Sequence, residues 1–169
     1  MKIVVVSDSH GRRKILEKIV EWNPDADLFL HCGDLCDDPD NYPQYHFCRG
    51  NCDSTSKMPL QNIIEVPGHR ILLVHSHNVV LFDRENQLAG MAKMNHCDIV
   101  CYGHTHRHHH ETKDGITLLN PGSCARPRDQ YPASYAILTL TKYSTKVRFL
   151  YEGKDWNLKK KSKIFKRKR

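Results

Sequence analysis

The sequence predicts an α/β fold in which two mixed β-sheets pack together and helices cover their outer faces. Short aliphatic runs typical of strands dominate the chain, and only two segments have helical spacing. Several of the runs follow one another as hairpins, which does not suit a simple doubly wound sheet. A chain of 169 residues is most consistent with one domain that buries a substantial core.

The first half of the chain contains one predicted helix. Residues 2–6 form a β-branched run suited to a strand that is buried on both faces. Residues 12–22 place apolar side chains at helical spacing, and Pro24 ends this helix. Two further strands are predicted at residues 27–31 and 46–49.

The second half contains more hairpins and the second predicted helix. Pro67-Gly68 lies between two apolar runs, which indicates a hairpin. Residues 83–95 have helical spacing, with predicted core positions at Leu88, Met91, Ala92 and Met94. The predicted strands of this half are residues 63–66, 70–75, 98–102, 116–119, 134–141 and 145–151.

We expect residues 1–153 to form the domain and residues 154–169 to form a basic, flexible tail. The net charge of +7 comes from this end, because eight of the 26 Lys and Arg residues lie in the last eleven positions. Basic tails can bind nucleic acid or anionic surfaces. A solvated chain end without a partner is the simpler interpretation.

The composition also indicates a cellular compartment. No apolar run approaches the ~18 residues that would span a membrane, and the first run is too short for a secretory signal. The seven cysteines are an odd number and none forms a CxxC pair. We interpret them as small buried side chains of a reduced, cytoplasmic protein, with a thiolate zinc site as the weaker alternative.

Five predicted strands carry side chains of the metal-binding type just beyond their carboxyl ends. Because ligands of open α/β sheets bind at this edge, we expect the five segments to converge. Each segment alone is a weak signal, but their joint occurrence favours a functional site over chance. The segments are Ser7-Asp8-Ser9-His10-Gly11, Cys32-Gly33-Asp34, Arg49-Gly50-Asn51-Cys52-Asp53, His75 and Gly103-His104-Thr105-His106.

The run CYGHTHRHHH at residues 101–110 contains two kinds of histidine. His104 and His106 stand two positions apart and can face one point from an extended backbone. The contiguous His108, His109 and His110 cannot all do so. We predict that the first two are metal ligands and that the last three lie on the surface.

The motifs SDSHG, HCGD, RGNCD, VHSH, YGHTH and NPGS resemble those of the calcineurin-like metallophosphoesterases, in particular the small bacterial and archaeal YfcE-like phosphodiesterase branch. The resemblance covers residues 1–151 and implies a four-layer α/β/β/α sandwich with two metal ions at one edge. The implied ligands of one ion are Asp8, His10 and His106, those of the other are Asn51, His75 and His104, and Asp34 bridges both. The implied catalytic residues are Asp34, Asn51, Cys52 and His75.

This ligand set is chemically reasonable by itself. One carboxylate can bridge two divalent ions, and mixed imidazole and carboxylate ligation suits manganese, iron, nickel or zinc better than magnesium or calcium. We predict two divalent ions, with manganese first and nickel, iron or zinc as alternatives. A hydroxide that bridges the ions would hydrolyse the ester, and the expected partner is a small phosphodiester or a nucleotide. We expect no membrane partner, and a homo-oligomer is compatible with the sequence.

Two positions depart from the family pattern. Many superfamily members have histidine where this chain has Cys52, and a neutral thiol is a poor proton donor to a leaving group. The YfcE-like branch shares this cysteine, so we expect a preference for phosphodiesters over monoesters and not a loss of activity. Ser76 replaces the glycine that is usual in this branch, which restricts the backbone beside His75.

Two other functions fit the same sequence. The eukaryotic retromer complex contains a protein of this fold that serves as an interaction scaffold and has lost some metal ligands. Here every ligand is retained, which favours an enzyme. A nucleic-acid-binding module that uses the basic tail would bind with strong salt dependence, and this function is compatible with catalysis.

Overall fold

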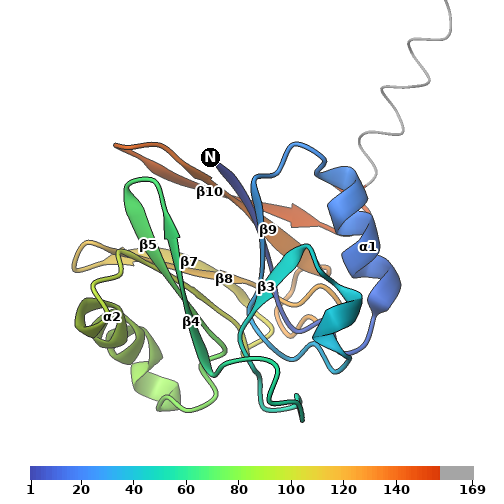
Figure 1. The fold of residues 1–169 in the computed structure, drawn as a ribbon, viewed down its shortest axis with the longest axis horizontal. Helices are drawn as coiled ribbons and strands as arrows, with labels where there is room; N and C mark the ends of the chain where they lie inside the picture. The colour runs from blue at the N-terminus through green and yellow to red at the C-terminus, as the bar shows by residue number, and fades with distance from the viewer. Residues whose placement is uncertain (157–169) are drawn as a thin grey trace, which may run out of the picture.

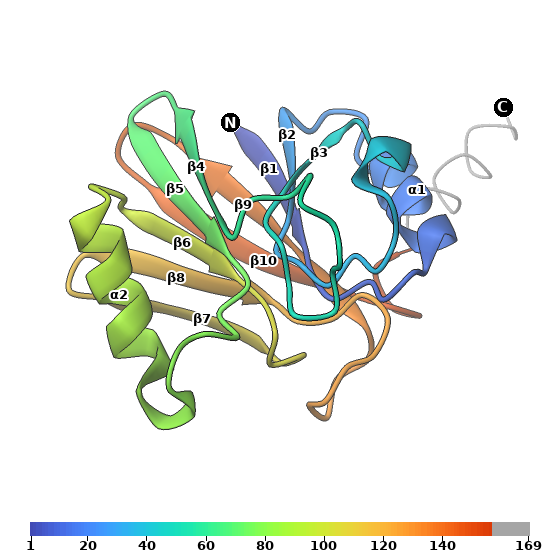
Figure 2. The same ribbon diagram turned by 60° about the horizontal axis from the view of Figure 1, so that its bottom comes forward.

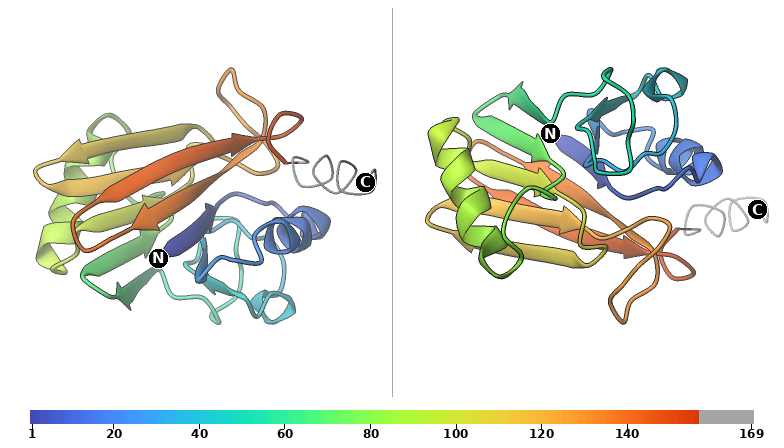
Figure 3. Two further views of the ribbon diagram at one scale, coloured as in Figure 1. Left: turned by 90° about the horizontal axis from the view of Figure 1, so that it is seen from above. Right: turned by 90° about the horizontal axis from the view of Figure 1, so that it is seen from below.

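The computed structural model describes residues 1–156, which form four layers in the order α/β/β/α (Figure 1). In spatial order, the first sheet consists of β10 (Thr145–Tyr151), β9 (Ser134–Leu140), β1 (Lys2–Val6), β2 (Leu28–His31) and β3 (Tyr45–Phe47). The second consists of β4 (Gln61–Val66), β5 (His69–Val74), β6 (Ile99–Tyr102), β8 (Ile116–Pro121) and β7 (His108–Lys113). Helices α1 (Arg13–Trp22) and α2 (Arg84–Met94) lie on opposite sides of the sheet pair (Figure 3).

Both sheets are mixed, so the predicted fold class is confirmed. Strands β1, β2 and β3 run parallel to one another in the first sheet, and β5, β6 and β8 do so in the second. The other strands pair antiparallel at the flanks. Parallel strands present their carboxyl ends at one edge, and in Figure 2 the loops that follow them gather below the two sheets.

The alternation of side chains along the central strands produces three apolar layers. In β1, Ile3 and Val5 pack between the two sheets, whereas Val4 and Val6 face α1. On the far side, α2 packs against the outer face of β5 and β6. Full burial of one such aliphatic side chain contributes about 1.5–3 kcal/mol, so the three layers hold the strand ends firmly in place.

Strand β7 corrects in part the prediction that His108, His109 and His110 lie on the surface. It pairs antiparallel with β8 along six residues. His108 is half-buried, its Nδ1 lies 2.8 Å from a carboxylate oxygen of Asp129, and its ring centroid lies 4.5 Å from that of Tyr131. The prediction is wrong for His108, because the strand is mostly polar and therefore has no apolar alternation that reveals its buried face. His110 is the exposed member of the three.

The predicted core of α2 is wrong at one position. Leu88 and Ala92 are buried against the second sheet, and Met91 packs partly against them, but Met94 is 82% exposed. On a helix of 3.6 residues per turn, position 94 lies about 240° around the axis from position 88. Its side chain therefore points away from the sheet.

Packing continues to Trp156, three residues beyond the predicted domain end at residue 153. The Trp156 side chain is buried, its ring centroid lies 5.8 Å from that of Trp22, and its Nε1 donates a 3.1 Å hydrogen bond to the Leu150 carbonyl. These contacts join the end of β10 to α1. The predicted basic tail from residue 157 onward lies outside the described residues.

Within residues 1–156, no helix has both the length and the apolar character needed to cross a membrane.

Candidate metal centre

The structure brings together all seven predicted ligands at the edge where the parallel strands end. Four of them form the first group, whose nitrogen and oxygen atoms lie within 4.8 Å of one another: Asp8, His10, Asp34 and His106. The second group consists of Asn51, His75 and His104. Asn51 Oδ1 lies 3.1 Å from His75 Nε2 and 3.0 Å from His104 Nδ1.

The Asp8 carboxylate has one satisfied and one unsatisfied oxygen. Its Oδ2 accepts hydrogen bonds from the Ser7 hydroxyl at 2.5 Å and from the His104 backbone N–H at 3.1 Å. Its Oδ1 is buried and has no hydrogen-bond partner within the described part of the chain. Imidazole Nε2 atoms lie 3.2 Å away in His106, 3.9 Å in His75 and 4.0 Å in His10. A buried, unpaired carboxylate oxygen among three imidazoles is costly unless a cation satisfies it, so these residues fit a metal ion.

Two imidazoles are fixed in the tautomer that a metal requires. His75 Nδ1 donates to the Cys32 carbonyl at 2.7 Å, and His106 Nδ1 donates to the Arg126 carbonyl at 2.6 Å. Because a carbonyl only accepts, the proton of each neutral ring stays on Nδ1 and the lone pair stays on Nε2. Backbone carbonyls commonly orient metal-binding histidines in this way.

Asp34 lies between the two groups. Its Oδ1 accepts a 2.8 Å hydrogen bond from the Cys52 backbone N–H, while its Oδ2 lies 3.4 Å from His75 Nε2 and 3.8 Å from His10 Nε2. Burial opposes ionisation of this carboxyl. While His75 is protonated, its hydrogen bond and charge, together with the Cys52 N–H, outweigh burial and hold the pKa of Asp34 well below the usual range. A cation bound to Nε2 of the neutral ring would supply the same positive charge. Asp34 is therefore an ionised carboxylate with one oxygen directed toward both groups.

The backbone at the centre adopts conformations that are rare for non-glycine residues. Positive φ angles occur in five of the seven predicted ligands: Asp8, His10, Asp34, His104 and His106. Such conformations cost about 1–3 kcal/mol each and cluster at functional sites. Gly50 and Gly103 permit the close approach of the loops, because a Cβ atom at either position would collide with Asp34 or with Ser7 and Asp8.

Several supporting groups were not predicted. The Asp53 carboxylate accepts from the backbone N–H groups of Asp34, Gly50 and Cys36, and so fixes the two loops to each other. The Ser123 hydroxyl donates to the Asp8 carbonyl at 2.8 Å. Asp53 and Ser123 lie within the RGNCD and NPGS motifs. The sequence did not predict their hydrogen-bond partners, because those partners are distant along the chain.

The two departures from the family pattern lie beside the centre. Cys52 is exposed, and its Sγ lies 3.7 Å from Asn51 Nδ2. Ser76 keeps the left-handed backbone expected of glycine, with φ 78°. Its hydroxyl lies 3.1 Å from the Gly103 carbonyl and accepts a 2.5 Å hydrogen bond from Arg84 Nη1. The serine therefore preserves the turn and adds contacts to it.

A two-sheet sandwich with carboxylate, amide and imidazole groups gathered at one edge defines a candidate two-metal hydrolase centre. Residues 1–143 match the calcineurin-like phosphoesterase superfamily domain, and the chain belongs to this family. It is 31% identical over 153 residues to the probable metallophosphoesterase YsnB of Bacillus subtilis, with 88% of this chain and 90% of YsnB covered. It is 30% identical over 167 residues to the phosphodiesterase YfcE of Escherichia coli K12, with 82% and 87% covered.

Solved structures agree with this assignment. A predicted phosphoesterase from Streptococcus pneumoniae TIGR4 superposes with a TM-score of 0.84 at 28% identity and covers 91% of both chains. A zinc complex of Vps29 from Entamoeba histolytica has a TM-score of 0.71 at 22% identity, covering 89% of this chain and 98% of Vps29, which shows a likeness of fold alone. The predicted family resemblance is confirmed. The chain is a phosphoesterase of a family whose members use divalent metal ions.

Proposed function

We propose that the chain is a phosphodiesterase that uses two divalent cations, one in the first group and one in the second. The supporting observation is the position of Asp34, whose Oδ2 lies within 4 Å of an imidazole nitrogen from each group. The unpaired Asp8 Oδ1 supports a cation in the first group independently. Two bound cations would activate a water molecule and neutralise the charge that develops on the phosphoryl group.

The contribution of the chain is to fix the donor atoms in place and in the correct protonation state. The low pKa of Asp34 keeps its carboxylate ionised, as a bridging ligand requires. The Cys32 and Arg126 carbonyls hold the rings of His75 and His106 with Nε2 directed inward. These imidazole, amide and carboxylate donors suit manganese first, and also iron, nickel or zinc.

We also propose that phosphodiesters are preferred over monoesters because of Cys52. A monoester with a poor leaving group gains a factor of ~10²–10⁴ in rate from protonation of that group, and a neutral thiol supplies this proton poorly. Burial and the charge of Asp34 raise the pKa of Cys52, which makes the thiol a still weaker proton donor.

A cytoplasmic location is also part of this proposal, and it is supported by the cysteines, all seven of which are free thiols.

The bridging assignment is tested with Asp34→Asn. We expect this variant to lose both ions and nearly all hydrolysis of bis-p-nitrophenyl phosphate, as measured by elemental analysis and by rate. Asp114→Asn is the matched control, because Asp114 also has a left-handed backbone but pairs with Lys93 on the surface. Two tightly bound ions in Asp34→Asn would refute the bridge.

The substrate preference is tested with Cys52→His. We expect the ratio of monoesterase to diesterase kcat/KM to rise in fully metallated protein, because imidazolium can protonate the leaving oxygen. An unchanged ratio would show that Cys52 does not set the preference. A parent enzyme that favours alkyl monoesters would overturn the substrate class. Metallated protein that is inactive on diesters, monoesters, cyclic nucleotides and short RNA would instead favour an interaction scaffold.

A further inference from the structure

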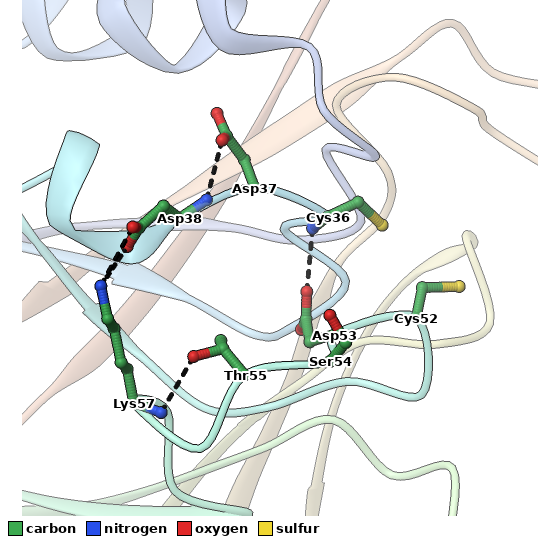
Figure 4. A pocket seen from close by; sticks show the side chains of 8 residues that line it. All are labelled: Cys36, Asp37, Asp38, Cys52, Asp53, Ser54, Thr55 and Lys57. Atoms are coloured by element: carbon green, nitrogen blue, oxygen red, sulfur yellow. Dashed lines mark hydrogen bonds and ion pairs between the residues drawn. The ribbon is translucent and has the colours of Figure 1, made fainter.

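A second set of metal-binding atoms lies on the open side of the first group. His10, Cys36 and Cys52 each offer one ligand atom, and these atoms lie within 4.8 Å of one another. His10 Nδ1 is 3.6 Å from Cys36 Sγ. Both cysteines line a cavity of about 370 Å³, and Figure 4 shows their thiols directed to the same side. The other five cysteines of the chain are buried.

The fold holds these two thiols in place. The Cys36 backbone N–H donates to Asp53 Oδ1 at 2.8 Å, and the Cys52 backbone N–H donates to Asp34 Oδ1 at the same distance. Cys36 also has a positive φ of 56°, a conformation that a non-glycine residue keeps only where its surroundings enforce it. The loops are therefore fixed in an arrangement that brings two exposed sulfur atoms to one imidazole nitrogen.

We propose that this thiol site, formed by His10 Nδ1, Cys36 Sγ and Cys52 Sγ, binds a thiophilic divalent cation of the zinc class. Both thiols are neutral before binding, and the cation displaces their protons to solvent. The resulting two thiolates and one imidazole form a soft donor set that manganese does not favour and zinc or cadmium does. Tetrahedral zinc, with Zn–N of 2.0–2.1 Å and Zn–S of 2.3 Å, separates a nitrogen and a sulfur ligand by about 3.6 Å. The cavity is also lined by Asp37, Asp38 and Lys57, and Lys57 pairs with Asp38, so the donor set and not the charge of the lining selects the cation.

Occupation of the thiol site has a consequence for the first group, because both use His10. A neutral imidazole has one lone pair, so coordination through Nδ1 leaves the proton on Nε2. His10 Nε2 faces the first group, 3.1 Å from His106 Nε2. A cation in the thiol site therefore removes one ligand from the first group and occupies the rim of the proposed active site. Excess zinc then inhibits the enzyme, a consequence that rests on the proposed function.

The test is a cadmium titration of the manganese-loaded full-length protein in a non-thiol reductant. We expect an ultraviolet cadmium–thiolate absorption band, together with release of manganese that is detected by electron paramagnetic resonance. In Cys36→Ser and Cys52→Ser the band should fall to about half, with about tenfold or greater loss of cadmium affinity. Cys97→Ser, which changes a buried thiol two residues before β6, is the control and should match the parent.

The outcomes separate this proposal from the proposed function. Absence of the band in the parent, or a band that both site variants retain in full, would refute the thiol site whatever the enzyme hydrolyses. Zinc inhibition, expressed relative to the zinc-free rate of each protein, should weaken about tenfold or more in Cys36→Ser. A band without release of manganese would refute the sharing of His10. Lack of phosphodiesterase activity in the parent would count against the proposed function alone, because the band does not require turnover.

Discussion

The two groups of the centre differ in how many of their polar atoms are buried without a hydrogen-bond partner. The first group is almost entirely buried, with Asp8 at 0%, Asp34 at 2% and His106 at 3% exposure, and it contains a carboxylate oxygen without a partner among residues 1–156. In the second group, Asn51 is exposed, and its amide oxygen lies 3.0 Å from His104 Nδ1, which can donate to it. A polar group that is buried and unpaired costs free energy, whereas one that is paired or solvated does not. We therefore expect the first group to bind its cation more tightly than the second.

The largest expected effect is that of Asp8→Asn. The amide replaces the one buried anionic oxygen without a partner in the first group, so affinity for the tighter ion should fall by more than about 100-fold, and hydrolysis with it. Manganese binding by calorimetry and the rate on bis-p-nitrophenyl phosphate provide the measurement. Retention of the tighter binding step would reverse the ranking of the two groups.

A smaller effect is expected for Asn51→Ala. The variant should keep the tighter ion, lose about 10–100-fold in affinity for the weaker one, and recover activity at high manganese concentration. Asn86→Ala on the exposed face of α2 is a suitable control. If Asn51→Ala instead lost the tighter ion, the two groups would not be separable.

A pH effect on stability should arise behind the first group, at His31. This residue is fully buried, its Nδ1 accepts from the Gly33 N–H, and its Nε2 donates to Ser9. Burial lowers its pKa to about 4, whereas the unfolded chain has about 6.5. Above about pH 6.5 His31 is neutral in both states and does not change the free energy of unfolding. Between pH 6.5 and 4 the unfolded chain binds a proton that the folded protein does not, so the free energy of unfolding falls by up to about 3 kcal/mol. Urea unfolding of the parent and of His31→Gln across this window should show a shallower decline in the variant; parallel declines would exclude His31 as the cause.

The smallest effect is expected behind the second group, at Ser76. Its left-handed backbone favours glycine, but its hydroxyl accepts a hydrogen bond from the buried Arg84. Ser76→Ala loses the hydroxyl and keeps the strain, whereas Ser76→Gly loses the hydroxyl and relieves the strain. Ser76→Ala should therefore be less stable than Ser76→Gly by about 1 kcal/mol in thermal unfolding. Equal stabilities would show that the turn is not strained.

The sequence alone was sufficient to predict the four layers and the edge where the ligands gather. Strands such as Lys2–Val6 and Ile99–Tyr102 are buried on both faces, so their composition identifies them locally. Each predicted ligand follows such a strand within a few residues, and parallel strands necessarily bring their carboxyl ends to one edge. Convergence of Asp8, Asp34 and His106 was thus a consequence of local patterns.

Only the tertiary structure shows the features that depend on contacts between residues far apart in the sequence. Strand β7 takes its hydrogen bonds from β8 and has no apolar pattern of its own, so His108 could not be placed from sequence. The Arg126 carbonyl orients His106 as a backbone group, and a backbone carbonyl leaves no signal in the amino-acid sequence. Cys36 and Cys52 stand 16 positions apart and meet His10 only because the Asp53 carboxylate joins their loops. Contacts of this kind are set by how the layers pack, and packing is a property of the whole chain.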